Sequence, residues 1–151
     1  MREFPHHYTA SAAASPEGDI TLGSGRLPEL RSAAPAEFDG PGDRWSPETL
    51  MTAAVADCFV LTFRAIAKAS KLPWLTLACH ASGTLDRVER VTQFTEFAVK
   101  ASLRVPAGTD VDQARRVLVR AEQGCLISNS LKGRVGFDME VSIEREAHIA
   151  A

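Results

Sequence analysis

Residues 46–70 read SPETLMTAAVADCFVLTFRAIAKAS, and this segment constrains the architecture of the whole chain. Ser46 can cap a helix, proline is tolerated at the first helical position, and Glu48 complements the positive end of the helix dipole. Apolar residues then cover nearly every face of the predicted helix. We therefore expect a helix buried between other elements, either at a dimer interface or inside a sheet that wraps around it.

Predicted strands flank this helix on both sides. On its N-terminal side, residues 4–14 and 19–24 can form a hairpin, and a short strand is expected near residues 30–32. On its C-terminal side, residues 75–88 and 92–105 alternate between apolar and polar side chains. This alternation predicts a second hairpin.

The last third of the chain adds two helices and a strand. Thr109 is expected to cap a helix at residues 110–123, a short helix follows at residues 126–131, and residues 134–144 predict a closing strand. The order of these elements predicts the α+β class. A length of 151 residues argues for a single domain that covers residues 1–151.

Composition restricts the class of protein. The chain is 45% hydrophobic and 24% charged with a formal net charge of -2, which is typical of a soluble globular protein and favours no nucleic-acid binding. No signal-peptide stretch is evident, and polar residues interrupt the longest apolar region, so we expect a cytoplasmic protein without a membrane partner. The four histidines lack metal-ligand spacing, and neither a metal nor a cofactor is expected.

Three cysteines are the main candidates for chemistry, because a reducing compartment favours free, catalytic or redox-active thiols. Composition alone favours Cys58 as a buried core thiol of the apolar helix. Cys125 follows Gly124 at a predicted helix N-terminus, where backbone N–H groups lower a thiol pKa, so functional and structural roles are equally supported. Cys79 lies on the apolar face of a strand and is expected to be a core thiol.

Three motifs resemble, in order and spacing, those of the OsmC/Ohr family of osmotically inducible and organic hydroperoxide resistance proteins. They are SPETL at residues 46–50, AAVADCF at residues 53–59 and CLISNSL at residues 125–131, within a resemblance that covers about residues 8–144. The resemblance implies antiparallel sheets around a long central helix in an intertwined homodimer. It also implies a stress-response thiol peroxidase that reduces organic hydroperoxides, with hydrogen peroxide as a further substrate and a dithiol such as a lipoylated protein as reductant.

The same resemblance assigns roles to two cysteines. Cys58 would be the peroxidatic thiolate, which attacks the terminal peroxide oxygen and becomes a sulfenic acid. Cys125 would be the resolving thiol, which condenses with the sulfenic acid to form a disulfide that an external dithiol reduces. Apolar residues such as Phe59, Phe63 and Leu126 are expected to line a pocket for the substrate.

A peroxidatic thiolate needs a positive partner that lowers its pKa. The family's well-characterised branch uses an arginine of the N-terminal strands, held by the glutamate that matches Glu48. This chain has neither arginine nor lysine between Arg2 and Arg26, which places it in a divergent, OsmC-like branch. Arg44 is the expected replacement, with Arg26 and Arg31 as further candidates, although a simple loop role for Arg44 is equally supported.

Helix geometry limits how Glu48 can act. Glu48 and Cys58 are ten residues apart, which separates them by about 15 Å along a straight helix and about 80° around it. If Glu48 serves a site at Cys58, it therefore does so across a two-fold axis. Compensation of the helix dipole is an equally supported role.

Two other functions are compatible with these residues. A redox-sensing or stress-protective binding protein with little turnover would form the same disulfide, and the missing strand arginine supports this alternative. A small-molecule or structural dimer domain with inert thiols is favoured if the Cα atoms of Cys58 and Cys125 lie more than about 7 Å apart with no mobile segment.

Overall fold

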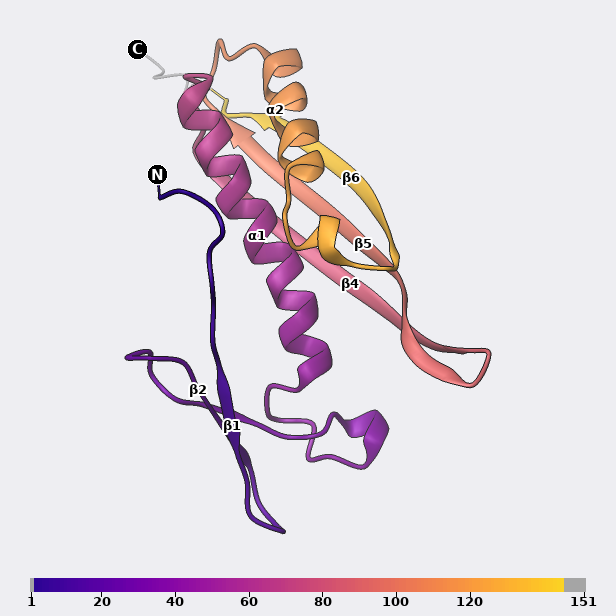
Figure 1. The fold of residues 1–151 in the computed structure, drawn as a ribbon. Helices are drawn as coiled ribbons and strands as arrows, with labels where there is room; N and C mark the ends of the chain where they lie inside the picture. The colour runs from indigo at the N-terminus through magenta and orange to yellow at the C-terminus, as the bar shows by residue number, and fades with distance from the viewer. Residues whose placement is uncertain (1, 146–151) are drawn as a thin grey trace, which may run out of the picture. The chain divides into compact units, whose positions relative to one another are not determined.

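The computed structural model describes residues 2–145, and the chain divides into two compact units, Met1–Leu50 and Met51–Ala151. Figure 1 shows the helices and strands of both units. Together they form the α+β class that the sequence predicts. The single domain at residues 1–151 stays a prediction, and its extreme ends lie outside the described residues.

The first unit contains a small antiparallel sheet in the order β1-β2-β3. Its strands are β1 (Ser11–Ala13), β2 (Ile20–Gly23) and β3 (Leu30–Ser32), followed by the 3-10 turn η1 (Ala36–Phe38). The predicted hairpin and the predicted third strand are confirmed. The first strand is shorter than residues 4–14, because its pairing with the four-residue β2 ends where Ser11 meets Gly23.

The long helix α1 (Pro47–Ala69) begins as the sequence predicts. The Thr49 amide donates to the hydroxyl of Ser46 at 3.2 Å, and the Ser46 amide donates to the hydroxyl of Thr49 at 2.8 Å. Two amides of the first turn are thereby satisfied reciprocally, as in a capping box. The helix ends at Ala69, before Lys71 takes a left-handed conformation with φ 53°.

Burial of α1 differs from the expectation. Only one stripe is buried in this chain, formed by Val55, Phe59, Phe63 and Ala67, while Met51 and Leu61 are 40% and 52% exposed. The reason is that the sheet and second helix of the same unit pack against this stripe and leave apolar positions beside it open. By length and composition α1 resembles a membrane span, a test that the core helix of a soluble protein also passes.

The second unit contains a three-stranded sheet in the order β4-β5-β6. The strands are β4 (Thr76–Val88), β5 (Val91–Val105) and β6 (Arg134–Ile143), close to the predicted bounds. A two-residue turn joins β4 to β5, and both of its residues have positive φ, 49° at Glu89 and 71° at Arg90. This pattern matches a hairpin turn whose twist suits the flanking strands.

One feature of this sheet corrects the expectation of antiparallel sheets. β4 and β5 are antiparallel, but β5 and β6 are parallel. Helix α2 (Val111–Gln123) lies between β5 and β6 in the chain. It returns the chain to the end of the sheet where β5 began, and such a crossover connects parallel strands.

The cap of α2 and the short helix expected after it also differ from the prediction. Asp110, and not Thr109, caps α2: its Oδ1 accepts from the amides of Asp112 at 2.9 Å and Gln113 at 3.1 Å. Both residue types can cap a helix, so composition could not separate these neighbours. The helix expected at residues 126–131 is a single 3-10 turn, η2 (Ser128–Ser130).

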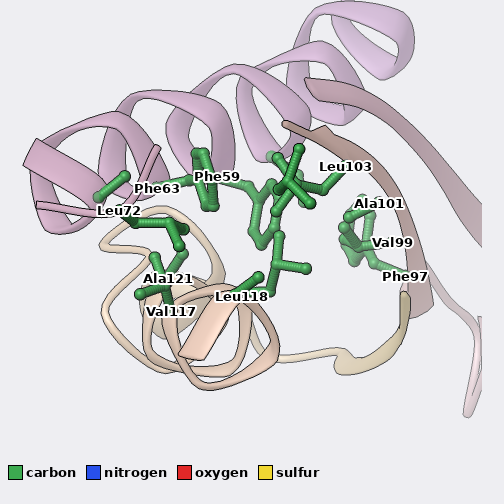
Figure 2. Packing of buried hydrophobic residues seen from close by; sticks show 14 residues of the cluster. Phe59, Phe63, Leu72, Phe97, Val99, Ala101, Leu103, Val117, Leu118 and Ala121 are labelled. Atoms are coloured by element: carbon green, nitrogen blue, oxygen red, sulfur yellow. The ribbon is translucent and has the colours of Figure 1, made fainter. Parts of the chain in front are cut away.

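The core of the second unit lies between α1, α2 and β5. Figure 2 shows these elements, with their labelled side chains directed toward one another. Phe59 of α1 contacts Phe137 of β6 with ring centroids 5.4 Å apart, and Phe63 packs edge-on against Trp74 at the same centroid distance. The buried cluster fixes α1 relative to the segment that follows α2.

Candidate active site

Cys58 lies halfway along α1, beside the buried Phe59, and its side chain is half-buried. The hydroxyl of Thr62, one turn later, donates to the backbone carbonyl of Cys58 at 2.7 Å. The same hydroxyl lies 4.0 Å from the Cys58 sulfur. Cys58 is therefore not the fully buried core thiol that composition alone favours.

Cys125 lies in the connection between α2 and η2 and is 1% exposed. Its amide donates to the carbonyl of Glu122 at 3.1 Å, and its sulfur accepts a hydrogen bond from the hydroxyl of Ser128 at 3.3 Å. The following turn begins only at Ser128 and contains three residues, so it supplies no long helix dipole to the thiol.

The expected lowering of the Cys125 pKa is therefore wrong. Burial raises the pKa of Cys125, and the neighbouring Cys58 thiol acts in the same direction, while the hydrogen bond from Ser128 opposes both. Desolvation disfavours the charged thiolate, and this effect depends on tertiary packing that the local sequence does not contain.

The thiols of Cys58 and Cys125 lie close enough to influence each other's ionisation, and both are free. Gly124 explains how the two segments come so close. A Cβ atom at Gly124 would lie 3.4 Å from the Thr62 methyl group on α1 and 3.1 Å from the carbonyl of Arg120. The missing side chain lets the end of α2 pack against the turn of α1 that carries Cys58.

Cys79 lies on β4, opposite Ala101 of β5, and packs against the core as predicted. Burial raises the pKa of Cys79 to about 11, and Cys125 acts in the same direction. A thiol with this pKa is protonated near neutral pH and is a poor nucleophile. The sequence did not lead us to expect that Cys79 lies near Cys125. The inward-facing position of Cys79 on a strand that pairs with β5 is the signal that could have indicated it.

Arg44 lies in the first unit and is bound by carboxylates. Its Nε donates to Asp19 at 3.0 Å, and its Nη1 lies 3.1 Å from the carboxylate of Asp43. The hydrogen bond to Asp19 raises the pKa of the Arg44 guanidinium. Arg31 lies 3.7 Å from the same Asp19 carboxylate. The positive charge of Arg44 is thus balanced within its own unit.

Glu48 is half-buried in the first turn of α1, the position that compensates the helix dipole. Arg26 is exposed in the loop before β3. The roles expected for Glu48 and Arg44 at a peroxide site stay predictions. Within residues 2–145, no group of three or more His, Cys, Asp or Glu side chains is placed to hold a metal ion, and His148 lies outside that range.

A pocket of about 340 Å³ lies in the second unit. Met51 lines it and lies two helical turns before Cys58, on the same face of α1. Residues 130–133, which comprise the last residue of η2 and the three that follow it, form another part of the wall. The other lining residues come from β5: Val91, Gln93, Phe94 and Phe97. The pocket is therefore mainly apolar, and its walls come from the helix that carries Cys58 and from the segment that follows Cys125.

The three residues expected to line a pocket, Phe59, Phe63 and Leu126, are not among its lining residues. Phe59 and Phe63 are fully buried in the core, and Leu126 is 65% exposed. The pocket is lined instead by residues at the start of α1 and β5. Apolar character alone did not separate core residues from pocket residues, because both follow the same periodicity.

Comparisons with known proteins agree with this architecture. The chain is 27% identical over 143 residues to the uncharacterized protein YmaD of Bacillus subtilis (strain 168), covering 92% of this chain and 95% of YmaD. It is 26% identical over 125 residues to peroxiredoxin OsmC of Escherichia coli (strain K12), covering 83% of this chain and 86% of that protein. The crystal structure of an organic hydroperoxide resistance protein OsmC from Legionella pneumophila has a TM-score of 0.71 and 25% identity, covering 93% of this chain and 99% of that one. The profile of the family described as OsmC-like protein matches residues 40–140, and the chain belongs to this family.

Proposed function

We propose that this protein is a thiol-dependent hydroperoxide reductase in which Cys58 is the peroxidatic cysteine and Cys125 the resolving cysteine. The closeness of these two thiols, which come from α1 and from the segment after α2, carries the proposal. The names of the E. coli and Legionella relatives support the same reaction class. The half-buried Cys58 can contact a substrate, whereas Cys125 is more deeply buried and is accessible mainly to Cys58.

The proposed reaction has three balanced steps. The Cys58 thiolate attacks the terminal oxygen of ROOH, the O–O bond breaks, and ROH leaves after taking up a proton, so Cys58 becomes a sulfenic acid. The Cys125 sulfur then attacks the Cys58 sulfur, the S–O bond breaks, and water leaves as the disulfide forms. An external dithiol reduces this disulfide and restores both thiols. We propose a lipoylated protein as one such dithiol.

The mainly apolar pocket of the second unit supports organic hydroperoxides as the main substrates. Its walls contain Met51, Phe94 and Phe97, and its size falls within the range of small-molecule sites. An alkyl or acyl group can bury apolar surface there, whereas hydrogen peroxide has none to bury. We therefore propose that hydrogen peroxide is a slower second substrate.

We further propose that the enzyme acts as a cytoplasmic homodimer. The apolar residues of α1 outside the buried stripe, such as Met51 and Leu61, support a second copy that covers this face. In such a dimer Glu48 of one copy would approach Cys58 of the other, and Arg44 would provide the activating charge. To take this role, Arg44 would first have to break its ion pair with Asp19 or Asp43.

Turnover of an organic hydroperoxide with a dithiol reductant tests the proposal. We expect Cys58→Ser to abolish turnover, and Cys125→Ser to complete one reaction and then accumulate sulfinic acid. Cys79→Ser is the matched control and should retain turnover. Mass spectrometry after one equivalent of oxidant should identify a Cys58–Cys125 disulfide. Unchanged peroxide consumption by Cys58→Ser would contradict the mechanism.

A redox-sensing or stress-protective protein with little turnover is the second candidate function. The two carboxylates that already balance the charge of Arg44 favour it, because an unassisted Cys58 thiolate would react slowly. In that case the same disulfide should form with one equivalent of oxidant, but the dithiol-coupled rate should stay far below that of a dedicated peroxidase. Steady-state kinetics with both peroxides separate the two functions.

A further inference from the structure

The hydroxyl of Ser128 is the polar side-chain group that contacts the sulfur of Cys125, apart from Cys58 itself, among the interactions described for residues 2–145. It donates to that sulfur at 3.3 Å. Ser128 begins the turn η2, and the amide of Asn129 donates to the Cys125 carbonyl at 3.0 Å. The turn therefore holds the backbone of Cys125 while the Ser128 side chain holds its sulfur.

We propose that Ser128 is a positioning residue for the resolving step: its hydroxyl orients the Cys125 sulfur toward Cys58 and stabilises the Cys125 thiolate that attacks. This inference rests on the proposed peroxidase function and deepens it. Solvent cannot readily replace this hydrogen bond, because Cys125 is 1% exposed. A hydrogen bond from a hydroxyl to a charged sulfur is stronger than one to a neutral thiol, so it favours ionisation.

The hydrogen bond from Ser128 matters because the resolving step requires an ionised Cys125. Cys125 must lose its proton before its sulfur attacks the sulfenic sulfur of Cys58, and the oxygen that leaves takes up a proton to become water. The titratable groups that act on Cys125 from the packed elements are Cys58 of α1 and Cys79 of β4. Neither supplies a positive charge. The Ser128 hydroxyl is therefore the side-chain group that opposes the effect of burial, and the Ser128 backbone amide acts in the same direction.

A first experiment measures Cys125 without any peroxide. In a background with Cys58→Ser and Cys79→Ser, Cys125 is the remaining cysteine, and the ultraviolet absorbance of its thiolate can be followed against pH. We expect Ser128→Ala to move the ionisation to higher pH and to lower the thiolate fraction near neutral pH about tenfold. Ser128→Thr, which keeps a hydroxyl, should restore the profile. An unchanged profile in Ser128→Ala would overturn the proposal.

Asn129→Ala is the matched control for the turn. It removes the hydrogen bond from the Asn129 side chain to the carbonyl of Gln123 at 3.0 Å, and it leaves the contact between Ser128 and the Cys125 sulfur in place. We expect the thiolate profile of Asn129→Ala to match that of the parent protein. An equal shift in both variants would mean that loosening of the turn, and not the Ser128 hydroxyl, is responsible, and would overturn the proposal.

A second experiment separates the two chemical steps in protein with all three cysteines. Trapping with dimedone reports the sulfenic acid at Cys58, and mass spectrometry reports the disulfide. We expect Ser128→Ala to leave sulfenic acid formation unchanged and to slow disulfide formation about tenfold near neutral pH, with a smaller deficit at higher pH. Equal slowing at every pH would support orientation of the sulfur and overturn the role in stabilising the thiolate, whereas an unchanged rate of disulfide formation at every pH would overturn the proposal. If no sulfenic acid forms at all, the peroxidase function fails, while the thiolate titration still tests Ser128.

Discussion

The two helices of the second unit relate to their surroundings in opposite ways. α2 buries Ala114, Val117, Leu118 and Ala121 and presents charged residues such as Arg115 and Arg116 outward. α1 buries a comparable stripe but also presents apolar residues outside it, including Leu61. Within a single chain, the apolar face of α2 is buried, whereas the apolar residues of α1 are buried on one side of the helix only. The comparison teaches that the helix carrying Cys58 leaves apolar residues uncovered in this chain, which is the observation that supports the proposed dimer.

The buried stripe of α1 should show the largest effect on stability. We expect Phe63→Ala to lower the free energy of unfolding by about 3–5 kcal/mol, because it leaves a cavity between α1 and Trp74. Guanidinium denaturation followed by circular dichroism measures this change. Leu118→Ala on α2 is the counterpart and should cost about 2–5 kcal/mol. A small effect at Phe63 would mean that α1 is not anchored in this core.

The exposed apolar face of α1 gives the next test. We expect Leu61→Ser to weaken self-association at least about tenfold, because a second copy would bury this side chain. Sedimentation at several protein concentrations measures the assembly state.

The control for that test lies on the polar face of α2. Arg116→Ala removes an exposed ion pair with Asp110 at 3.8 Å and should change neither assembly nor stability by more than about 0.5 kcal/mol. If Leu61→Ser and Arg116→Ala behave alike, the contrast between the helices has no bearing on assembly.

The junction between the two helices can be tested by adding a methyl group at Gly124. We expect Gly124→Ala to cost about 1–3 kcal/mol and to slow formation of the disulfide, because its Cβ would crowd the Thr62 methyl group and the Arg120 carbonyl. Thermal unfolding and mass spectrometry measure both effects. Thr62→Ser removes the methyl group and keeps the hydroxyl. In that background Gly124→Ala should be partly tolerated, and equal damage in both backgrounds would place the strain at Arg120 alone.

The sheet beneath both helices offers a test by pH. Burial raises the pKa of Cys79 to about 11 in the folded protein, from an ordinary thiol value of 9.0. Its stabilising contribution is therefore complete below about pH 9 and is lost as pH rises toward 11, because the unfolded chain releases its proton first. We expect Cys79→Ala to flatten the fall in stability over this range. An unchanged fall would assign it to other groups.

The cap of α2 should give the smallest effect. Asp110 accepts two amide hydrogen bonds, so Asp110→Ala is expected to cost about 1 kcal/mol of stability. Thr109→Ala is the natural comparison and should cost less, because Asp110 provides the cap. Urea denaturation resolves the two variants. A larger loss in Thr109→Ala would return the capping role to the residue that the sequence first indicates.

Local signals predicted the elements well and their tertiary relations less well. The start of α1 follows from Ser46 and Pro47, and the α+β, OsmC-like fold is confirmed. The direction of β6 was missed because alternation of side chains fixes the faces of a strand and not its orientation. The raised pKa of Cys125 was missed because burial comes from residues distant in sequence. Pairing of Cys58 with Cys125 came from the motif resemblance, since composition favoured a core role for Cys58.

The order of strands in the second sheet has a consequence for biogenesis. Among residues 2–145, β5 is the middle strand, and its edge away from β4 pairs with β6, which follows it in the chain. During translation the apolar α1 emerges first, followed by a β4–β5 hairpin with one open edge, and neither is fully covered. Open strand edges and exposed apolar helices favour aggregation in such intermediates. The growing chain should therefore depend most on chaperones just before β6 leaves the ribosome.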